Sequence, residues 1–304
     1  MKALKAALLS MLAAAALMTG CSDSKTDTDV EVDIGDIKAD TDVSVDISDI
    51  EKDYKTNQLT QMDFVFDTDK NVSEFGVSID TGNITIEYSR DNKTGLSLEY
   101  TVYADTEEVC KEVKSHLNAI AETNGSRLDI RLIEDKTQED ISSWLRKNIP
   151  DCRVEYDLYI TVPEFVSSFE AKENVGNLTF GDICGKFSGI VGVGNITCTG
   201  SQFTESSVIK CDTGNIAMSD CIYKADTDIT ADTGNITFCL PLNGSGGADI
   251  SVKADTGNIK MTGIKNYDVK SENKKDTSHS LSIEVENCNI GFAANTGKII
   301  IDKE

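Results

Sequence analysis

The sequence predicts a mainly β protein whose main domain is a parallel, β-helix-like β-solenoid with rungs of roughly 20 residues. The first observation is a recurring unit: IDTGNITI begins at Ile79, CDTGNIAM at Cys211, ADTGNITF at Ala231 and ADTGNIKM at Ala254. A catalytic motif is normally needed once, so a unit that recurs indicates architecture. The second observation is the regular spacing of the units, and the third is the alternation of apolar and polar residues within each of them.

The units can be aligned on the asparagine that follows their turn glycine. These asparagines are Asn83, Asn177, Asn195, Asn215, Asn235 and Asn258, and Lys298 takes this place in a degenerate last unit. From Asn177 to Asn258 the intervals are 18, 20, 20 and 23 residues. Repeats of this period are typical of solenoids, in which each rung needs its neighbours to bury its apolar face.

Each unit has the pattern of two short strands with a turn between them. The residues one and three places after the asparagine are apolar, as in Ile236 and Phe238, and the residue between them is most often Thr. Most units have apolar or small residues four and six places before the asparagine, as in Ala231 and Ile229. This alternation is that of half-buried strands.

A glycine precedes this asparagine place throughout, at Gly82, Gly176, Gly194, Gly214, Gly234, Gly257 and Gly297. Only glycine adopts positive φ freely, so these positions predict a sharp corner in each rung. Stacked corners would place one asparagine above the next, about 4.8 Å apart, and such ladders satisfy side-chain amides along a solenoid. The glycines and asparagines are therefore predicted to be structural.

Residues 1–20 are typical of a lipoprotein signal peptide. Lys2 and Lys5 precede an apolar run, residues 6–18, that is too short for a comfortable membrane span. The run ends in Met18-Thr19-Gly20-Cys21, which resembles the lipobox of bacterial lipoproteins, where the chain is cut before the cysteine and lipid is attached to it. The resemblance implies a bacterial cell-envelope protein, extracytoplasmic and held to the lipid bilayer through Cys21. An ordinary secretory signal is the alternative.

Three further regions follow the signal peptide. Residues 21–60 are predicted to be an acidic tether, because they are rich in Asp and poor in aromatic residues, although TDVEVDIGDI and TDVSVDISDI within them could also be two edge strands. Residues 61–165 are predicted to be a strand and helix segment, with strands at 62–66, 75–79, 95–103, 127–133 and 153–162 and helices at 106–123 and 137–147. Residues 166–304 are predicted to be the repeat β-solenoid.

The charge and the cysteines limit the partners and the chemistry. The net charge is -23, and loss of Lys2 and Lys5 with the signal peptide makes it -25, which repels nucleic acid and excludes it as a partner. Eight cysteines remain besides Cys21, and no CxxC pair occurs, so neither a zinc ribbon nor a thioredoxin-like site is indicated. An even number permits disulfides, but several occupy apolar places of the repeat, which favours buried free thiols.

The repeated TGNI and GNIT units, the helix-containing segment before them and the strand that ends in Ile160-Thr161-Val162-Pro163 resemble the bacterial "putative adhesin" domains of unknown function. The resemblance covers about residues 62–304. Members often show TGDI or SGDI, whereas the Asp is mostly Asn here, with Gly181-Asp182-Ile183 as the exception. It implies an exported repeat β-solenoid, in some members linked to envelope stress, and it provides no catalytic residue.

Recurring carboxylates are the one candidate for a metal site. Asp80, Asp212, Asp232 and Asp255 stand two places before the turn glycine, and a stacked column of them would offer oxygen ligands to calcium. The simpler interpretation is that each aspartate starts its turn by bonding to the backbone. No cofactor and no metal are therefore predicted.

No catalytic residue is predicted either. The chain has two histidines, His116 in an expected helix and His279 in the polar stretch 270–280 that is expected to be an exposed loop, and both are expected to be surface residues. With 52 acidic residues, a carboxylate pair of the glycosidase kind arises by chance. The leading prediction is a non-enzymatic, surface-exposed lipoprotein whose flat solenoid faces bind an envelope or extracellular protein or glycan, or sense the envelope. The alternatives are an envelope-polysaccharide enzyme and an accessory scaffold to a membrane stress sensor.

Overall fold

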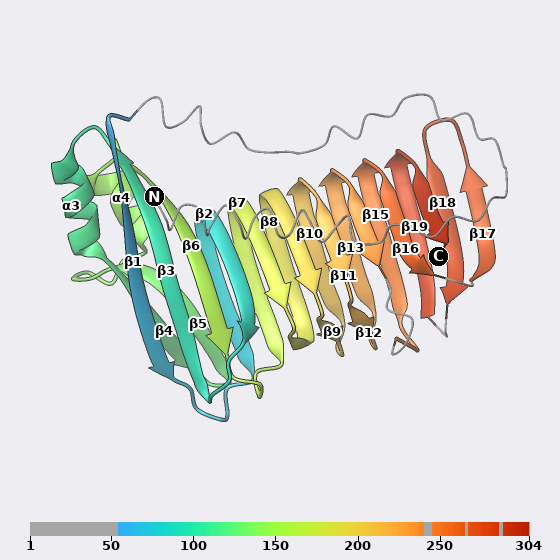
Figure 1. Ribbon diagram of the computed structural model, residues 1–304, viewed down its shortest axis with the longest axis horizontal. Coiled ribbons are helices and arrows are strands. Elements are labelled where there is room, and N and C mark those ends of the chain that lie inside the picture. The colour runs from blue at the N-terminus through green and yellow to red at the C-terminus, as the bar shows by residue number, and fades with distance from the viewer. Residues whose placement is uncertain (1–53, 240–244, 265–266, 286–287, 304) are drawn as a thin grey trace. The chain divides into compact units, whose positions relative to one another are not determined.

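The computed structural model describes residues 54–239, 245–264, 267–285 and 288–303 (Figure 1). All of the described residues belong to one compact unit, Asp42–Glu304. The predicted signal peptide, the lipidation site Cys21 and the tether up to residue 53 lie outside the described residues. Neither of the described helices is long and apolar enough to cross a membrane.

The described residues form a mainly β fold with a 20-stranded sheet and two helices. In the first three repeats one strand runs through the corner: β2 (Glu74–Tyr88), β7 (Ser168–Gly181) and β8 (Cys184–Thr199). In the later repeats separate strands precede and follow the corner, namely β10 (Ser207–Thr213) and β11 (Ile216–Ser219), β13 (Thr227–Thr233) and β14 (Ile236–Cys239), β15 (Asp249–Thr256) and β16 (Ile259–Ile264), and β19 (Cys288–Thr296) and β20 (Ile299–Lys303). Successive repeats pair in parallel, as the row of strands in Figure 1 shows.

The parallel register places equivalent residues of successive repeats opposite one another. Asn83 lies opposite Asn177, and Asn177 lies opposite Asn195. Two short strands, β9 (Gln202–Phe203) and β12 (Ile222–Tyr223), pair with each other and, through β9, with the start of β8. Side chains of one kind therefore form columns along the row of repeats.

The inward columns form a continuous core. Five aromatic rings from different strands follow one another along the interior, at ring-centroid separations of 5.5, 4.4, 5.0 and 5.2 Å: Phe169, Phe187, Phe203, Tyr223 and Phe238. All five side chains are buried. Because each ring packs against the rings of the neighbouring repeats, a rung owes most of its stability to the rungs beside it.

An insertion between the first and second repeats covers one end of the row. β2 pairs with β7 along almost its whole length, so residues 89–167 leave the repeat and return to it. On its other side β2 pairs in parallel with β5 (Arg127–Glu134) before the corner and with β6 (Arg153–Val162) after it. β6 continues antiparallel into β3 (Lys93–Ala104), and β3 into β1 (Thr56–Asp67). The insertion therefore covers both halves of the first rung.

The predicted helix at 106–123 is wrong in its second half. α3 spans Glu107–His116, with Thr106 as its N-cap, and the chain continues as β4 (Leu117–Asn124). β4 pairs antiparallel with β5 along all of its residues, across a turn where Gly125 has φ 62°. Leu117 and Ile120 have helical spacing, but pairing with β5 lets the backbone of this segment bond across the hairpin, and tertiary contacts override the local pattern.

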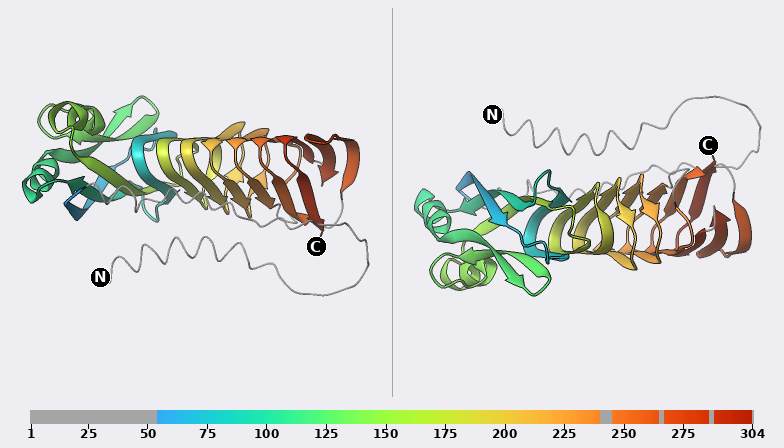
Figure 2. Two further views of the ribbon diagram at one scale, coloured as in Figure 1. Left: turned by 90° about the horizontal axis from the view of Figure 1, so that it is seen from above. Right: turned by 90° about the horizontal axis from the view of Figure 1, so that it is seen from below.

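The second helix begins later than predicted. α4 spans Ile141–Asn148, and its N-cap is Asp140, whose Oδ1 accepts a 2.9 Å hydrogen bond from Ser143 N. Thr137, the predicted first residue, instead hydrogen-bonds to Glu134. Both helices lie at the same end of the row of repeats, far from β20 (Figure 2).

A hairpin covers half of the other end. β17 (Asp268–Lys274) and β18 (His279–Val285) are antiparallel, and β18 pairs with β19. The stretch 270–280, expected to be an exposed loop, is a hairpin whose residues 270–277 are exposed, but His279 is buried, with 7% of its surface exposed, so the expectation that it is a surface residue is wrong. In earlier rungs the amide after the asparagine donates to the next rung, as Ile236 N does to Asn258 O at 2.9 Å. In the last rung Ile299 N donates to His279 Nδ1 at 3.2 Å. The hairpin therefore provides the hydrogen-bond acceptor that the next rung provides in earlier repeats.

The sheet as a whole is mixed, so the prediction of a mainly β fold is confirmed, whereas the finer prediction of a parallel β-solenoid is not. Parallel pairing links the repeats, whereas the antiparallel pairs β1–β3, β3–β6, β4–β5, β17–β18 and β18–β19 lie in the two end segments. Strands joined by short turns can only pair antiparallel. The pairs β4–β5, β17–β18 and β18–β19 are connected in this way, whereas β1–β3 and β3–β6 join strands that are distant in the chain, and the repeats return to the same face after a full rung.

Candidate functional site

The glycines and asparagines predicted from the sequence lie at the corners of the repeats. The seven glycines have φ values between 138° and 153°, which only glycine adopts readily: Gly82, Gly176, Gly194, Gly214, Gly234, Gly257 and Gly297. The side-chain Oδ1 of each asparagine from Asn83 to Asn258 accepts the backbone N–H of the equivalent residue in the next repeat, at 2.9–3.1 Å, with Lys298 as the last donor. At the first rung Asn83 Nδ2 donates to Asp157 Oδ1 on β6. The ladder fixes the corners against one another.

The aspartates proposed as weak calcium ligands are bonded to lysines. Lys210 Nζ lies 2.7 Å from Asp212 Oδ1 and 3.6 Å from Asp232 Oδ2, and Lys253 Nζ lies 2.9 Å from Asp255 Oδ1. An ammonium therefore occupies the position at which a cation would meet these carboxylates. Among the described residues no group of three or more His, Cys, Asp or Glu side chains is placed to hold a metal ion.

The outward side chains after the corner form a strip without charge. In register, Thr179, Thr197, Ala217 and Thr237 follow one another across β7, β8, β11 and β14. Two places further along the same strands stand Thr199, Ser219 and Cys239, which are half-buried, and Gly181, which is buried and has no side chain. Glu87 and Lys260 bound the strip at its two ends. We call these eight positions the hydroxyl face, and Thr–Ser contacts such as Thr199 Oγ1 to Ser219 Oγ, at 3.2 Å, link its rows.

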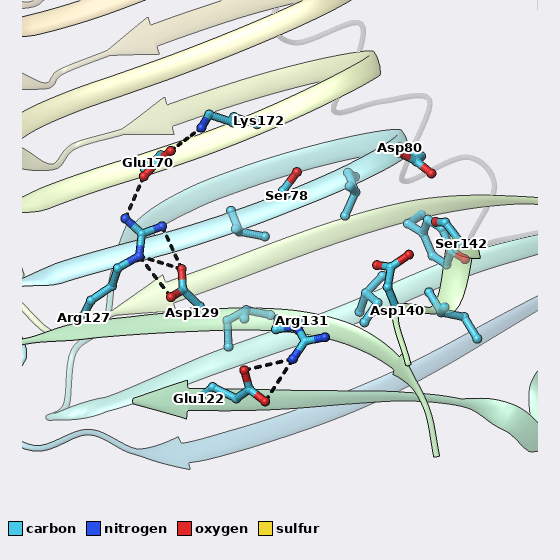
Figure 3. A pocket seen from close by; sticks show the side chains of 16 residues that line it. Ser78, Asp80, Glu122, Arg127, Asp129, Arg131, Asp140, Ser142, Glu170 and Lys172 are labelled. Carbon is cyan, nitrogen blue, oxygen red and sulfur yellow. Dashed lines mark hydrogen bonds and ion pairs between the residues drawn. The ribbon is translucent and has the colours of Figure 1, made fainter. Parts of the chain in front are cut away.

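A polar groove of ≈ 470 Å³ lies between the insertion and the first two repeats (Figure 3). Its walls are β2 and β7 on one side, and β4, β5 and the start of α4 on the other. Eight charged side chains line it: Asp80, Glu122, Arg127, Asp129, Arg131, Asp140, Glu170 and Lys172. Val77, Ile79, Ile130, Leu132, Ile141 and Tyr156 add apolar surface.

Ion pairs hold the cations of the groove in place. Arg127 bridges Asp129, at 2.8 Å, and Glu170, at 2.7 Å, and these carboxylates raise the pKa of its guanidinium. Lys172 first, and Arg127 second, lower the pKa of Glu170 below its usual value. Arg131 Nη1 contacts both carboxylate oxygens of Glu122 at 3.0 Å. The three cations of the groove are therefore already neutralised by neighbouring carboxylates.

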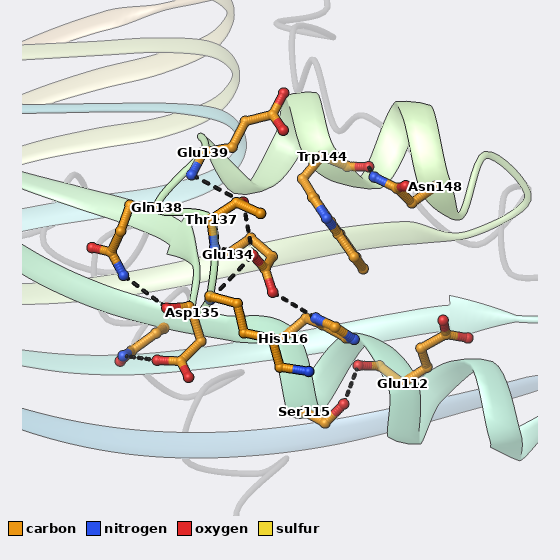
Figure 4. Close-up of polar contacts among 12 residues, drawn as sticks. Glu112, Ser115, His116, Glu134, Asp135, Thr137, Gln138, Glu139, Trp144 and Asn148 are labelled. Carbon is orange, nitrogen blue, oxygen red and sulfur yellow. Dashed lines mark hydrogen bonds and ion pairs between the residues drawn. The ribbon is translucent and has the colours of Figure 1, made fainter.

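A second polar cluster stabilises the turn before α4 (Figure 4). Glu134 is almost fully buried, and His116 Nδ1 lies 2.7 Å from its Oε1, while Thr137 N and Oγ1 donate to its Oε2 at 2.6 and 2.7 Å. The bond to His116, with those of Thr137 and Lys136, lowers the pKa of Glu134 to about 2. His116 also stacks on Trp144, with ring centroids 4.5 Å apart. The expectation that His116 is an ordinary surface residue is wrong, because it joins α3, β5 and α4.

One carboxyl lies inside the repeats. Glu173, on β7, is 3% exposed and takes the place that is apolar in neighbouring repeats, between Ile79 on β2 and Val191 on β8. Neither of its carboxyl oxygens has a hydrogen-bond partner. Burial first, and Asp157 second, raise the pKa of Glu173 to about 8. The eight described cysteines are free thiols, and five of them are buried.

Sequence reasoning did not find the groove. Its residues come from β2, β4, β5, α4, β6 and β7, and the insertion separates β2 from β7 in the chain. The alternating charges of Arg127, Asp129 and Arg131 were the one local signal, and alone they indicate only the solvent side of a strand.

The comparisons with known proteins concern the fold. No family model matches the chain, and no curated protein matches it. Two crystal structures are similar. One is of a "putative adhesin" from Bacteroides fragilis, with 16% identity, a TM-score of 0.37, and coverage of 81% of this chain and 97% of that one. The other is of a "putative cell adhesion protein" from Clostridium sporogenes, with 9% identity, a TM-score of 0.31, and coverage of 81% and 100%. Likenesses this weak carry no functional argument.

Proposed function

We propose that the chain is a non-enzymatic lipoprotein of the bacterial envelope, whose repeats act as a parallel β-solenoid and whose hydroxyl face is the contact surface of an adhesin-like binding module. The observation that carries this proposal is the row of eight uncharged, mostly small residues, seven of them with a side chain, across four consecutive repeats in a chain of net charge -23.

The physical properties of the hydroxyl face suit a large partner. Burying an unpaired charge is costly, so a face that has none can be covered at low desolvation cost. Its side chains are short, so little side-chain entropy is lost on contact. The asparagine ladder and the aromatic column hold its rows in fixed register. A flat and repetitive partner, such as an envelope or extracellular protein or a glycan, fits these properties.

The charges of the groove support binding over hydrolysis. A glycosidase needs one carboxyl whose pKa is raised, so that it can act as an acid, beside a second that is ionised. In the groove Glu170 has a lowered pKa, and Asp129 and Glu122 contact arginines. Glu173 has a raised pKa but is buried inside the repeats.

An arginine on the hydroxyl face is expected to weaken binding. Thr197→Arg and Thr237→Arg place a long, charged side chain on the strip, and each is expected to weaken retention of the ectodomain, residues 22–304, by at least about tenfold. The measurement is retention on an array of bacterial wall fragments, host glycans and matrix proteins, with released sugar assayed in the same wells.

Thr230→Arg is the matched control for the face. Thr230 is also an outward, half-buried threonine, on β13, but it lies before the corner and therefore on another face. Its variant is expected to bind as the wild type does. Equal retention of all three variants would contradict the assignment of the face, and released sugar would contradict the non-enzymatic proposal.

Lipid anchoring has a separate test. Cys21→Ser removes the thiol to which lipid would be attached, so the variant is expected to leave the membrane fraction, because one acyl-carrying residue supplies the whole anchor. Cys152→Ser, a thiol in the described part of the chain, is the control and should still cofractionate with membranes. Continued membrane association of Cys21→Ser would contradict the proposal of a lipoprotein.

A further inference from the structure

The groove has an acidic end where three side chains from different elements meet. Asp80 comes from β2, Asp140 is the N-cap of α4, and Tyr156 comes from β6. Figure 3 shows Asp140 reaching into the groove from the start of α4, with Ser78 and Asp80 on the β2 side. Residues of three separate elements thus line the same groove.

Tyr156 is the unusual member of this group. Tyr156 is buried, with 2% of its surface exposed, and its hydroxyl has no hydrogen-bond partner. Burial raises the pKa of this phenol, and the nearby Cys152, Asp140 and Asp80 raise it further. Buried hydroxyls are normally hydrogen-bonded, so an orphaned one that lines a groove indicates a missing partner.

The two carboxylates retain unused capacity for a cation. Among the described residues the Asp140 side chain forms no ion pair, and it accepts a hydrogen bond from the backbone N–H of Ser143. Asp80 accepts from Asn174 Nδ2 at 3.0 Å and has a 3.7 Å contact with Arg146 Nη1. The Arg146 side chain is 71% exposed, and such a surface pair contributes little.

The other charges of the groove favour a cation over an anion. Its lining has five carboxylates and three cations, and the three cations are each bonded to a carboxylate. An anion would meet neutralised cations beside two exposed carboxylates. A metal ion would lack ligands, because no group of three or more ligating side chains is placed for one in the described part of the chain.

We propose that Asp80, Asp140 and Tyr156 form a binding site for an organic ammonium group. An ammonium has three N–H donors and no acceptor, which matches two carboxylates and one phenolic oxygen. Its carbon chain would lie against the apolar part of the groove, including Ile79 and Ile141. Two sources have this chemistry: a lysine side chain of a partner protein and the amine of an amino sugar. The site is separate from the hydroxyl face, so either proposal can fail without the other.

The test uses small amines with uncharged isosteres. Acetyl-lysine methylamide, free at its side-chain amine, and glucosamine are titrated into the purified full chain at pH 7, with the norleucine analogue and N-acetylglucosamine as uncharged counterparts, and binding is followed by calorimetry. At least one amine is expected to bind saturably, and its counterpart is not. Binding of the lysine probe alone indicates a protein partner, and binding of glucosamine alone indicates an amino sugar. If neither amine binds saturably, the proposal is wrong.

Variants locate the site. Asp140→Asn keeps a good N-cap but removes the charge, and Tyr156→Phe removes the hydroxyl; both are expected to weaken amine binding by about tenfold or more. Arg146→Ala is expected to tighten it, because it removes a competing cation from Asp80. Tyr100→Phe is the matched control, since Tyr100 lies opposite Tyr156 in the β3–β6 pair but does not line the groove. Unchanged affinity in Asp140→Asn and Tyr156→Phe would overturn the assignment.

Discussion

Glu173→Gln is expected to change the free energy of unfolding in a pH-dependent way. The change at pH 7 is expected to be about 3 kcal/mol more stabilising than the change at pH 4. The pKa of Glu173 in the folded chain is raised to about 8, whereas in the unfolded chain the carboxyl ionises near its ordinary 4.5. The stability associated with protonated Glu173 is therefore complete below pH 4.5 and is lost as the pH rises through 8. Glutamine cannot ionise, so the variant lacks this loss. The measurement is urea unfolding of both chains from pH 4 to pH 9.

The geometry around Glu173 explains why it keeps its proton. A β-carbon built on Gly176 would lie 1.5 Å from Gly82 O and 2.0 Å from Glu173 Oε1, so these two oxygens are close neighbours. A carbonyl oxygen and an ionised carboxylate repel each other, and burial deprives the ionised form of its hydration. Asp157, across the first corner, adds a further negative charge. A glutamine amide has a similar shape and carries no charge at any pH.

Glu170→Gln is the control for this prediction. Glu170 is on the same strand, but it faces outward, and Lys172 and Arg127 lower its pKa. Its ionised form is the stabilising one, and that stabilisation is lost only as the pH falls below its ordinary value, so the substitution should shift stability by a constant amount between pH 5 and 8. If Glu173→Gln and the wild type lose stability in parallel over this range, Glu173 does not titrate as described.

Gly234→Val is expected to destabilise the chain by at least about 3 kcal/mol. Gly234 has φ 146°, which valine does not adopt, and its β-carbon would lie 1.7 Å from the carbonyl oxygen of Gly214 in the preceding rung. Neither strain can be relieved locally, because the carbonyl belongs to a corner that the asparagine ladder holds in place. Because each rung is stabilised by its neighbours, the substitution also destabilises the rungs on both sides. The measurement is thermal unfolding followed by circular dichroism.

Gly291→Val makes the same chemical change without the strain. Gly291 lies on β19, where a β-carbon would have no neighbour within 4 Å. Valine is a good strand residue, so this variant is expected to melt within a few degrees of the wild type. An unchanged melting temperature for Gly234→Val would show that the corner tolerates a side chain and would remove the physical reason for the repeated glycines.

The repeats were predictable because their causes are local. The requirement for positive φ selects glycine at each corner, and alternating burial selects apolar residues one and three places after the asparagine. Both signals recur along the repeats, so the pattern can be recognised even where a single unit departs from it. The segment 106–123 had no such repetition, and there Leu117 and Ile120 matched a helix although β5 was near enough to pair with them.

The sequence by itself determined the rung: its corner glycines, its asparagine ladder and its inward columns, since each depends on residues close together in the chain. The tertiary structure alone decided how the row of repeats ends, where the groove lies and why Glu173 keeps its proton. These features depend on residues brought together from far apart, as Arg127 and Glu170 of the groove are across 43 positions. His279 shows the same dependence, because its polar stretch indicates a loop until the last rung, with an amide in need of an acceptor, is placed beside it.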